Sequence, residues 1–288
     1  MKNFEFLHNV TIGQYLPTGS AIHRTHPAVK MLSAGFLGTA VIISGSLSAL
    51  CLSLIAVLIG MKTAKIPFRY ALRGIRPAIP IIVFVALLQV LFATQGDGGT
   101  VYWESRVIAI TSGDFLVAGV TALRLVVLIL IISFFTLCTD VKELTHGTER
   151  LLKPLERIRF PVHEFSMIIT VTLRFLPILS DEAENLIKAQ ASRGADFGKG
   201  KMGVFKRVYR MLPLFVPLLI VSLRRAENLG LAMEARCYTG GKGRTQLIRF
   251  HMRRSDFLGL FVTVIVAGAI LGIHFSRFDR MIWERLFR

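Results

Sequence analysis

The sequence predicts an all-α, polytopic membrane protein with a cytoplasmic domain of amphipathic helices. Hydrophobic residues make up 53% of the 288 residues, more than the about 45–50% of a soluble domain, and they are gathered in long blocks. The formal net charge is +17, and the cations lie mainly between these blocks, as the positive-inside rule describes for cytoplasmic loops. We therefore expect the lipid bilayer, and no nucleic acid, as the partner of this basic chain.

About four membrane spans are expected in residues 28–138. The first apolar run, Ala28–Met61, is long for one span of about 20 residues and short for two. Ser44-Gly45-Ser46 lies in its middle, which favours a hairpin of two short helices; a single long, tilted helix is the alternative. Pro77–Thr94 and Phe115–Cys138 supply the remaining spans.

Charged residues orient these spans. Lys62–Arg76 is rich in Lys and Arg and is predicted to be a cytoplasmic loop. Gln95–Asp114 is polar and glycine-rich, with Arg106 as its single cation, and is predicted to lie outside. Arg124 interrupts the span that follows. We interpret it as snorkelling toward the outer headgroups, the alternative being a partner or water inside the protein.

The second half of the chain has a different character. Charged residues are frequent in Thr139–Asp256, and Lys and Arg outnumber Asp and Glu. His163–Leu179 and the proline-containing Leu212–Leu223 resemble amphipathic helices against the membrane surface more than spans. Asp181–Ala195 reads as a separate polar helix between them. Phe257–Phe275 is predicted to be the final span.

These patterns divide the chain into four parts. They are an N-terminal cytoplasmic segment (1–27), about four transmembrane helices (28–138), a cytoplasmic helical domain (139–256), and a C-terminal transmembrane helix with its tail (257–288). Arginines lie on both sides of the last span, so the charge rule leaves the side of the tail open.

Catalytic and nucleotide-binding motifs are missing from the sequence. There is no GxxxxGK[ST] loop, no HExxH and no GxSxG, so we expect no catalytic residue, no cofactor and no enzyme activity of the chain itself. His23 and His26 lack the carboxylate or cysteine support that a metal site needs. The predicted spans carry no Asp or Glu, the usual groups of proton- or ion-coupled carriers. A transport protein of this kind is expected to draw energy from a partner.

Two similar short motifs indicate where such a partner binds. Ser192-Arg193-Gly194 and Ala235-Arg236-Cys237 each combine small residues with an arginine near a predicted helix end. Gly194 and Gly240 fit helix C-termini. A simple helix-dipole contact explains one such arginine, whereas the repetition favours two guanidinium forks that bind carboxylates of a docking partner.

These motifs resemble the T component of energy-coupling factor (ECF) transporters, the ABC-type vitamin and metal importers of prokaryotes. Further matching segments are Ile22–Lys30, Leu173–Pro177 and Leu223–Arg236. The sequence departs from the family at Ser192, where alanine is usual, at Cys237, where glycine or serine is usual, and at His26, where aspartate is common. The small side chains at the two motifs are kept, so docking is expected to survive these changes.

The resemblance implies a coupling function in the prokaryotic cytoplasmic membrane. Two ABC ATPase subunits would bind Arg193 and Arg236, and their ATP-driven movement would reach a separate substrate-binding S component for vitamin or other micronutrient uptake. Two alternatives remain at this point. A self-sufficient secondary transporter or channel would have repeated, broken spans around a central site, and a membrane enzyme would have a convergent set of catalytic side chains.

Overall fold

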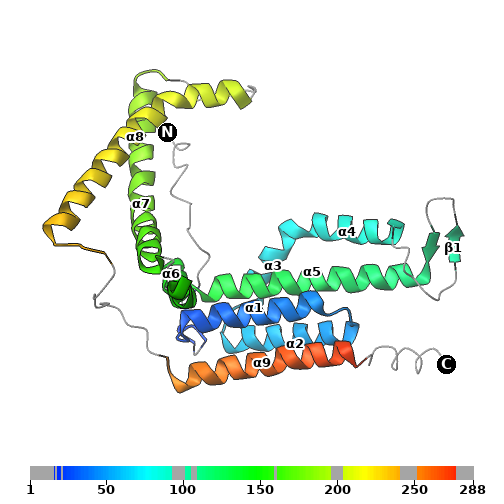
Figure 1. The fold of residues 1–288 in the computed structure, drawn as a ribbon. Helices are drawn as coiled ribbons and strands as arrows, with labels where there is room; N and C mark the ends of the chain where they lie inside the picture. The colour runs from blue at the N-terminus through cyan, green and yellow to red at the C-terminus, as the bar shows by residue number, and fades with distance from the viewer. Residues whose placement is uncertain are drawn as a thin grey trace. The chain divides into compact units, whose positions relative to one another are not determined.

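The computed structural model of the protein describes residues 16, 18–20, 22–92, 101–104, 109–158, 161–195, 204–240 and 252–276. Its helices are α1 (Pro27–Ile43), α2 (Leu47–Thr63), α3 (Phe68–Ile75), η1 (Arg76–Ala78), α4 (Ile79–Phe92), α5 (Ser112–Cys138), α6 (Val141–Leu152), η2 (Lys153–Ile158), α7 (Val162–Ser192), α8 (Val204–Ala235) and α9 (Arg254–Phe275). One small antiparallel hairpin joins β1 (Val101–Glu104) to β2 (Ala109–Thr111). The predicted all-α class is confirmed (Figure 1).

The chain forms two compact units. One contains the described residues of 13–147 and 250–288, and we call it the membrane unit. The other contains the described residues of 148–249, and we call it the α7–α8 unit after its two long helices.

The membrane unit is built on the packing of α1, α2, α5 and α9. Leu50 of α2 and Val127 of α5 are fully buried in its main core. A second cluster brings together Ala40, Ala49 and Ala267 from three different helices. Small residues let helix backbones approach closely inside a membrane, where contact between helices replaces the hydrophobic effect as the source of stability. Figure 1 shows these helices lying side by side.

The hairpin predicted for the first apolar run is confirmed. α1 and α2 are separated by residues 44–46, which are not helical. Each helix has 17 residues and is therefore about 26 Å long, slightly less than the roughly 30 Å hydrocarbon core of a bilayer. A single tilted helix through this segment is thereby ruled out.

The prediction of a loop over Lys62–Arg76 is wrong in its second half, because α3 occupies Phe68–Ile75; the cytoplasmic side of this segment stays a prediction. Ala71 is fully buried, and a Cβ added at Gly74 would lie 3.1 Å from Ser133 Oγ of α5. Close packing of two small residues against α5 stabilises a helix that the charge pattern alone does not reveal. α4 follows and leaves apolar side chains such as Phe84 exposed, as a lipid-facing helix does.

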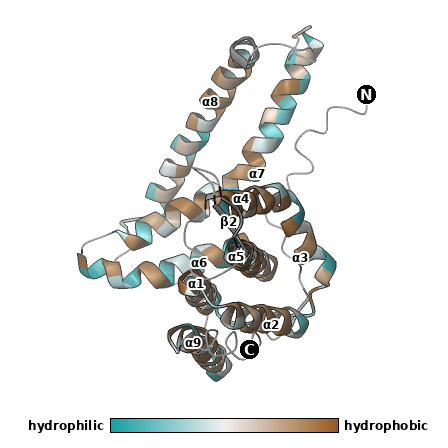
Figure 2. Ribbon diagram, turned by 90° about the vertical axis from the view of Figure 1, so that its right-hand side faces the viewer, coloured by the Kyte–Doolittle hydropathy of each residue, from teal (hydrophilic) through white to brown (hydrophobic). Residues whose placement is uncertain are grey.

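Four helical segments are long and apolar enough to cross a membrane, judged by length and composition: Phe68–Leu91, Gly113–Cys138, Val162–Ser192 and Arg254–Phe275. α1 and α2 are shorter apolar helices. The protein is therefore a membrane protein, as predicted. Val162–Ser192 meets this criterion although the sequence favoured an amphipathic helix there. Figure 2 shows hydrophilic residues interrupting α7 and α8, whereas α1, α2, α4, α5 and α9 are mostly hydrophobic.

The α7–α8 unit corrects the predicted helix boundaries. His163–Leu179 and Asp181–Ala195, predicted to be separate helices, form one helix that continues through Pro177. α8 likewise extends far beyond Leu212–Leu223 and contains Pro213 and Pro217. A proline removes one backbone hydrogen bond and bends a helix without necessarily ending it, and α8 changes direction along its length in Figure 1.

Candidate functional site at two helix ends

The first predicted motif forms the C-terminal end of α7. Gly194 has a positive φ of 85°, which glycine adopts without strain. Its N–H donates to Ala191 O at 3.0 Å, and the Ala195 N–H donates to Gln190 O at 3.0 Å. These two bonds are the Schellman arrangement that satisfies the last carbonyls of a helix. Ser192 Oγ donates to Lys188 O at 3.0 Å, and the Arg193 side chain is exposed.

The second motif ends α8 in the same way. The Cys237 N–H donates to Glu234 O at 2.8 Å, and the Tyr238 N–H donates to Met233 O at 3.0 Å. Relative to Arg236, these bonds have the same spacing as those around Arg193. The helix ends at Ala235, and Cys237 takes the position with positive φ, at 56°. The prediction that Gly240 ends this helix is wrong, since Gly240 lies three residues beyond the cap.

The two helices run in opposite directions and cross. Arg225 Nη2 of α8 lies 3.7 Å from Glu182 Oε2 of α7, and a Cβ at Gly240 would lie 3.8 Å from Glu164 Oε1 near the start of α7. Arg225 of α8 thus meets a later residue of α7, and Gly240, beyond the end of α8, meets an earlier one, as in an antiparallel pair. The motifs consequently lie at opposite ends of the pair and are not brought together (Figure 1).

Each arginine lies the same number of residues beyond its helix's partner in the Arg225–Glu182 contact. Arg193 lies eleven residues beyond Glu182, and Arg236 lies eleven residues beyond Arg225. At 1.5 Å per residue, each arginine is about 16 Å of helix away from the crossing contact. Both side chains are exposed, and neither forms an ion pair with another described residue. The α7–α8 unit thus presents one exposed arginine at the C-terminal end of each of its two long helices.

Comparison with known proteins places this architecture in a family. A family model described as "Cobalt transport protein" (CbiQ) matches residues 18–247, which include both helix ends. The chain is 39% identical over 252 residues to the energy-coupling factor transporter transmembrane protein EcfT of Acidaminococcus fermentans, covering 88% of this chain and 92% of the relative. It is 37% identical to that of Ruminiclostridium cellulolyticum over 259 residues, covering 90% and 95%. The chain belongs to the EcfT family.

Membership favours a transmembrane subunit of an energy-coupling factor transporter over a self-sufficient transporter or channel. The EcfT protein of Heliobacterium modesticaldum, 38% identical over 265 residues, is covered to 96% of its length. The resemblance inferred from the two arginine motifs is therefore confirmed over most of the chain.

The two histidines near the start of this EcfT-family chain have structural contacts. The Ala28 N–H donates to His26 Nδ1 at 3.2 Å, so His26 caps α1, a task that aspartate also performs well. His23 Nδ1 lies 2.7 Å from Ser20 Oγ. Burial, reinforced by the nearby Lys30 cation, lowers the pKa of His23 below its usual value. No group of three metal-binding side chains occurs among the described residues.

Arg124 has a specific partner in the membrane unit, and the interpretation that it snorkels to the headgroups is wrong. Its Nη2 donates to Ser44 O at 2.8 Å, at the break between α1 and α2. The Gly45 N–H of the same break donates to His274 Nδ1 of α9 at 3.1 Å. Side chains of α5 and α9 therefore satisfy the backbone groups that the break leaves open. The sequence did indicate a non-helical break at Ser44-Gly45-Ser46. Backbone groups at a break inside a membrane need hydrogen-bond partners, so polar side chains such as Arg124 could have been expected there.

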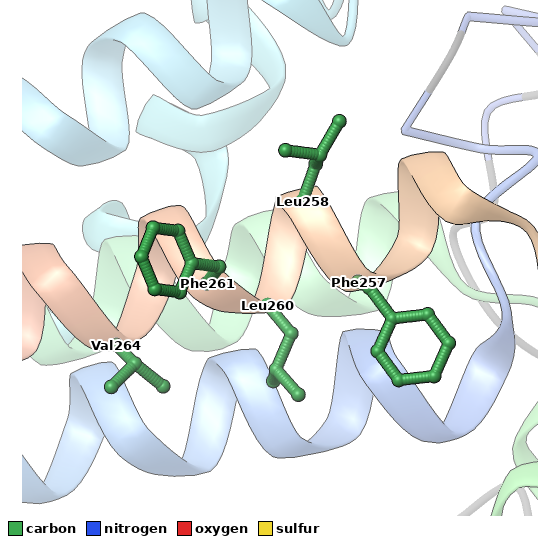
Figure 3. Close-up of a pocket in the computed structure, with 5 residues that line it drawn as sticks. All are labelled: Phe257, Leu258, Leu260, Phe261 and Val264. Atoms are coloured by element: carbon green, nitrogen blue, oxygen red, sulfur yellow. The ribbon is translucent and has the colours of Figure 1, made fainter.

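A shallow apolar hollow lies on α9 of the membrane unit (Figure 3). Its lining residues are Phe257, Leu258, Leu260, Phe261 and Val264. They all come from one helix, and most are exposed. Such a surface suits lipid chains and offers no polar group to orient a vitamin or a metal ion.

Proposed function

We propose that this chain is the coupling subunit of an ECF-type importer. In this proposal Arg193 and Arg236 dock two ABC ATPase subunits, with Ser192, Gly194, Ala235 and Cys237 shaping the two helix ends. ATP-driven movement of the ATPases is carried by α7 and α8 to the membrane and to a separate S component that binds substrate. The observation that carries the proposal is the matched cap geometry of the two helix ends, each with an exposed arginine at the same position.

Two helix ends with the same cap geometry fit a pair of similar partners. A guanidinium group is planar and always charged, and it binds a carboxylate through two parallel hydrogen bonds. The caps support this role because their backbone bonds satisfy the helix ends and leave the arginine side chains exposed. The same geometry at both helix ends suits two copies of one type of acidic groove.

In this proposal each part of the chain and each partner chain has its own task. The proposed coupling domain in the cytoplasm spans 139–256, and its first residues, 139–147, pack within the membrane unit. The proposed membrane part is 28–138 and 257–288, with 1–27 as a cytoplasmic segment. ATP hydrolysis belongs to the partner chains, since the sequence has no phosphate-binding loop. The S component selects the cargo, a vitamin or another micronutrient.

Charge reversal at the two arginines tests this function. The chain is co-expressed with the ATPase subunits and S components of its host, and uptake of radiolabelled riboflavin, biotin and Co²⁺ is measured together with ATPase co-purification. Removing one partner of a desolvated charge pair costs about 2–5 kcal/mol, so Arg193→Glu and Arg236→Glu should each weaken docking by tenfold or more, since about 1.4 kcal/mol is tenfold. The double variant should abolish uptake while remaining in the membrane.

Arg224→Glu is the matched control, because Arg224 is an exposed arginine on α8 away from the cap. It should leave docking within about threefold, since exposed charges contribute little. Near-normal uptake by the double variant would refute the proposal. It would mean that the two arginines only interact with the helix dipoles, a contact worth about 0.3–1 kcal/mol.

A further inference from the structure

A buried lysine joins three segments of the membrane unit. Lys30, near the start of α1, is 7% exposed. Its Nζ donates to His23 O at 2.8 Å, to Cys138 O at 3.1 Å and to Glu143 Oε2 at 2.8 Å. The acceptors belong to the segment before α1, the end of α5 and the beginning of α6. One ammonium group therefore uses all three of its donors to hold α6 against α1 and α5.

One turn after Glu143, α6 also packs closely against α1. A Cβ added at Gly147 would lie 2.8 Å from Met31 Sδ and 3.2 Å from the carbonyl carbon and the Cβ of Pro27. No larger residue fits there without a shift of α1. Thr145 is also buried. The first seven residues of α6, Val141–Gly147, are thus fixed to α1 by an ion pair at one end and by contact packing at the other.

This attachment stops within α6. The boundary between the two compact units falls between Gly147 and Thr148, although the helix continues to Leu152. η2 follows, with all six of its residues exposed, and α7 begins at Val162. The chain that leads to α7 therefore passes from one compact unit to the other within α6.

We propose that Val141–Gly147 is a stationary anchor, with Lys30 and Glu143 as its positioning residues, and that the coupling movement begins beyond Gly147. This inference rests on the proposed function, because an anchor is needed only if α7 transmits movement to the membrane unit. In the proposed function the ATPases pull on α7. That pull reaches the membrane unit only if α6, which connects the two, stays fixed to α1.

A disulfide between α1 and α6 tests whether the anchor stays closed. Pro27→Cys/Gly147→Cys is made in a chain whose three native cysteines are replaced by serine. A Cβ added at Gly147 would lie 3.2 Å from Pro27 Cβ, below the usual 3.5–4.5 Å of a disulfide. The disulfide therefore needs the same shift of α1 that any side chain at Gly147 needs. In the assembled transporter, uptake of the radiolabelled probes by the oxidised form should stay within about twofold of the reduced form, as expected for a contact that does not change between states.

Two results would overturn the anchor. Loss of uptake on oxidation with recovery on reduction would mean that the contact opens during transport. Failure of the two cysteines to cross-link in the folded protein would mean that α1 and α6 are not in contact there. Gly147→Cys alone, treated with the same oxidant, controls for the bulk of the new side chain.

Lys30→Met tests the positioning role separately. It leaves Glu143 without its cation, so uptake per ATP hydrolysed should fall about tenfold, within the range by which coupling residues act. ATPase co-purification should remain within twofold of the wild type. Glu143→Gln keeps an acceptor for Lys30 and should lower the coupling ratio less. Lys142→Met, an exposed lysine on the same helix, should change neither quantity.

The outcomes separate this inference from the proposed function. If Lys30→Met lowers uptake, ATP hydrolysis and ATPase capture in the same proportion, Lys30 only supports folding and the positioning role is wrong. If the wild-type chain captures no ATPase at all, the proposed function fails first. A changed coupling ratio with normal capture supports both.

Discussion

The membrane unit buries residues such as Leu50, Ala49 and Ile270 completely, whereas the α7–α8 unit buries almost nothing. Among the described residues of the α7–α8 unit, only Val162 and Ser166 are buried. Apolar side chains on both of its long helices, including Ile168 and Phe215, are more than 60% exposed. The membrane unit therefore has a core of its own, and the α7–α8 unit needs lipid or partner chains to cover its apolar faces. Substitutions of one residue type should have different effects in the two units.

The largest difference between the two units is expected when a leucine is truncated to alanine. Leu50→Ala removes a fully buried side chain and should cost about 2–5 kcal/mol of unfolding free energy. Leu223→Ala changes a side chain that is 55% exposed and should cost no more than about 0.5 kcal/mol. Denaturant unfolding of the purified chain in detergent measures both. Equal losses would show that α7 and α8 possess a core after all.

Adding a methyl group to a glycine should give effects of opposite sign. Gly147→Ala places a Cβ 2.8 Å from Met31 Sδ, and such overpacking costs about 1–3 kcal/mol. Gly230 lies within α8 and a Cβ there meets nothing within 4 Å, so Gly230→Ala should stabilise the helix by about 0.5–1 kcal/mol. Thermal unfolding should show a lower Tm for the first variant and an unchanged or higher Tm for the second.

Removing an arginine should lower the free energy of unfolding more in the membrane unit than in the α7–α8 unit. Arg124→Met leaves Ser44 O without its donor, with an expected loss of about 0.6–1.7 kcal/mol, the range for polar contacts between membrane helices. Arg225→Met removes a 3.7 Å contact between partly exposed groups, which is worth at most about 1 kcal/mol. A larger loss for Arg225 than for Arg124, again by denaturant unfolding, would contradict the ranking.

Local signals in the sequence predicted much of this fold. Long apolar runs marked the helices of the membrane unit, the Ser44-Gly45-Ser46 break marked the hairpin, and Gly194 marked the end of α7. These features depend on neighbouring residues along the chain. The arginine motifs were visible for the same reason, since small residues and a charge cluster within a few positions.

The features that the sequence missed depend on distant partners. α3 forms because Ala71 and Gly74 pack against α5. The partner of Arg124 lies eighty positions away in the chain, and the three acceptors of Lys30 come from separate segments. α7 and α8 extend well beyond the apolar runs His163–Leu179 and Leu212–Leu223 that predicted them. In each case a tertiary contact or a long flanking helix outweighs the local preference.

The smallest expected effect compares the two helix ends themselves. Gly194 and Cys237 hold the same position in their caps, with φ of 85° and 56°. A residue with a Cβ pays about 1–2 kcal/mol to adopt this conformation, partly balanced by the greater freedom that glycine loses on folding, about 0.5–1 kcal/mol. Cys237→Gly should therefore stabilise the α8 cap by about 0.5–1 kcal/mol, and Gly194→Ala should weaken the α7 cap by a similar amount.

Amide hydrogen exchange measures this difference where it arises. The Tyr238 N–H closes the α8 cap and the Ala195 N–H closes the α7 cap, so Cys237→Gly should slow exchange at Tyr238 and Gly194→Ala should speed it at Ala195, each by about two- to fivefold. Arg236 keeps its place at the helix end in the glycine variant, so ATPase capture should not fall. Unchanged exchange at Tyr238 would mean that cysteine is accommodated there without strain, and the two caps would then differ in sequence but not in stability.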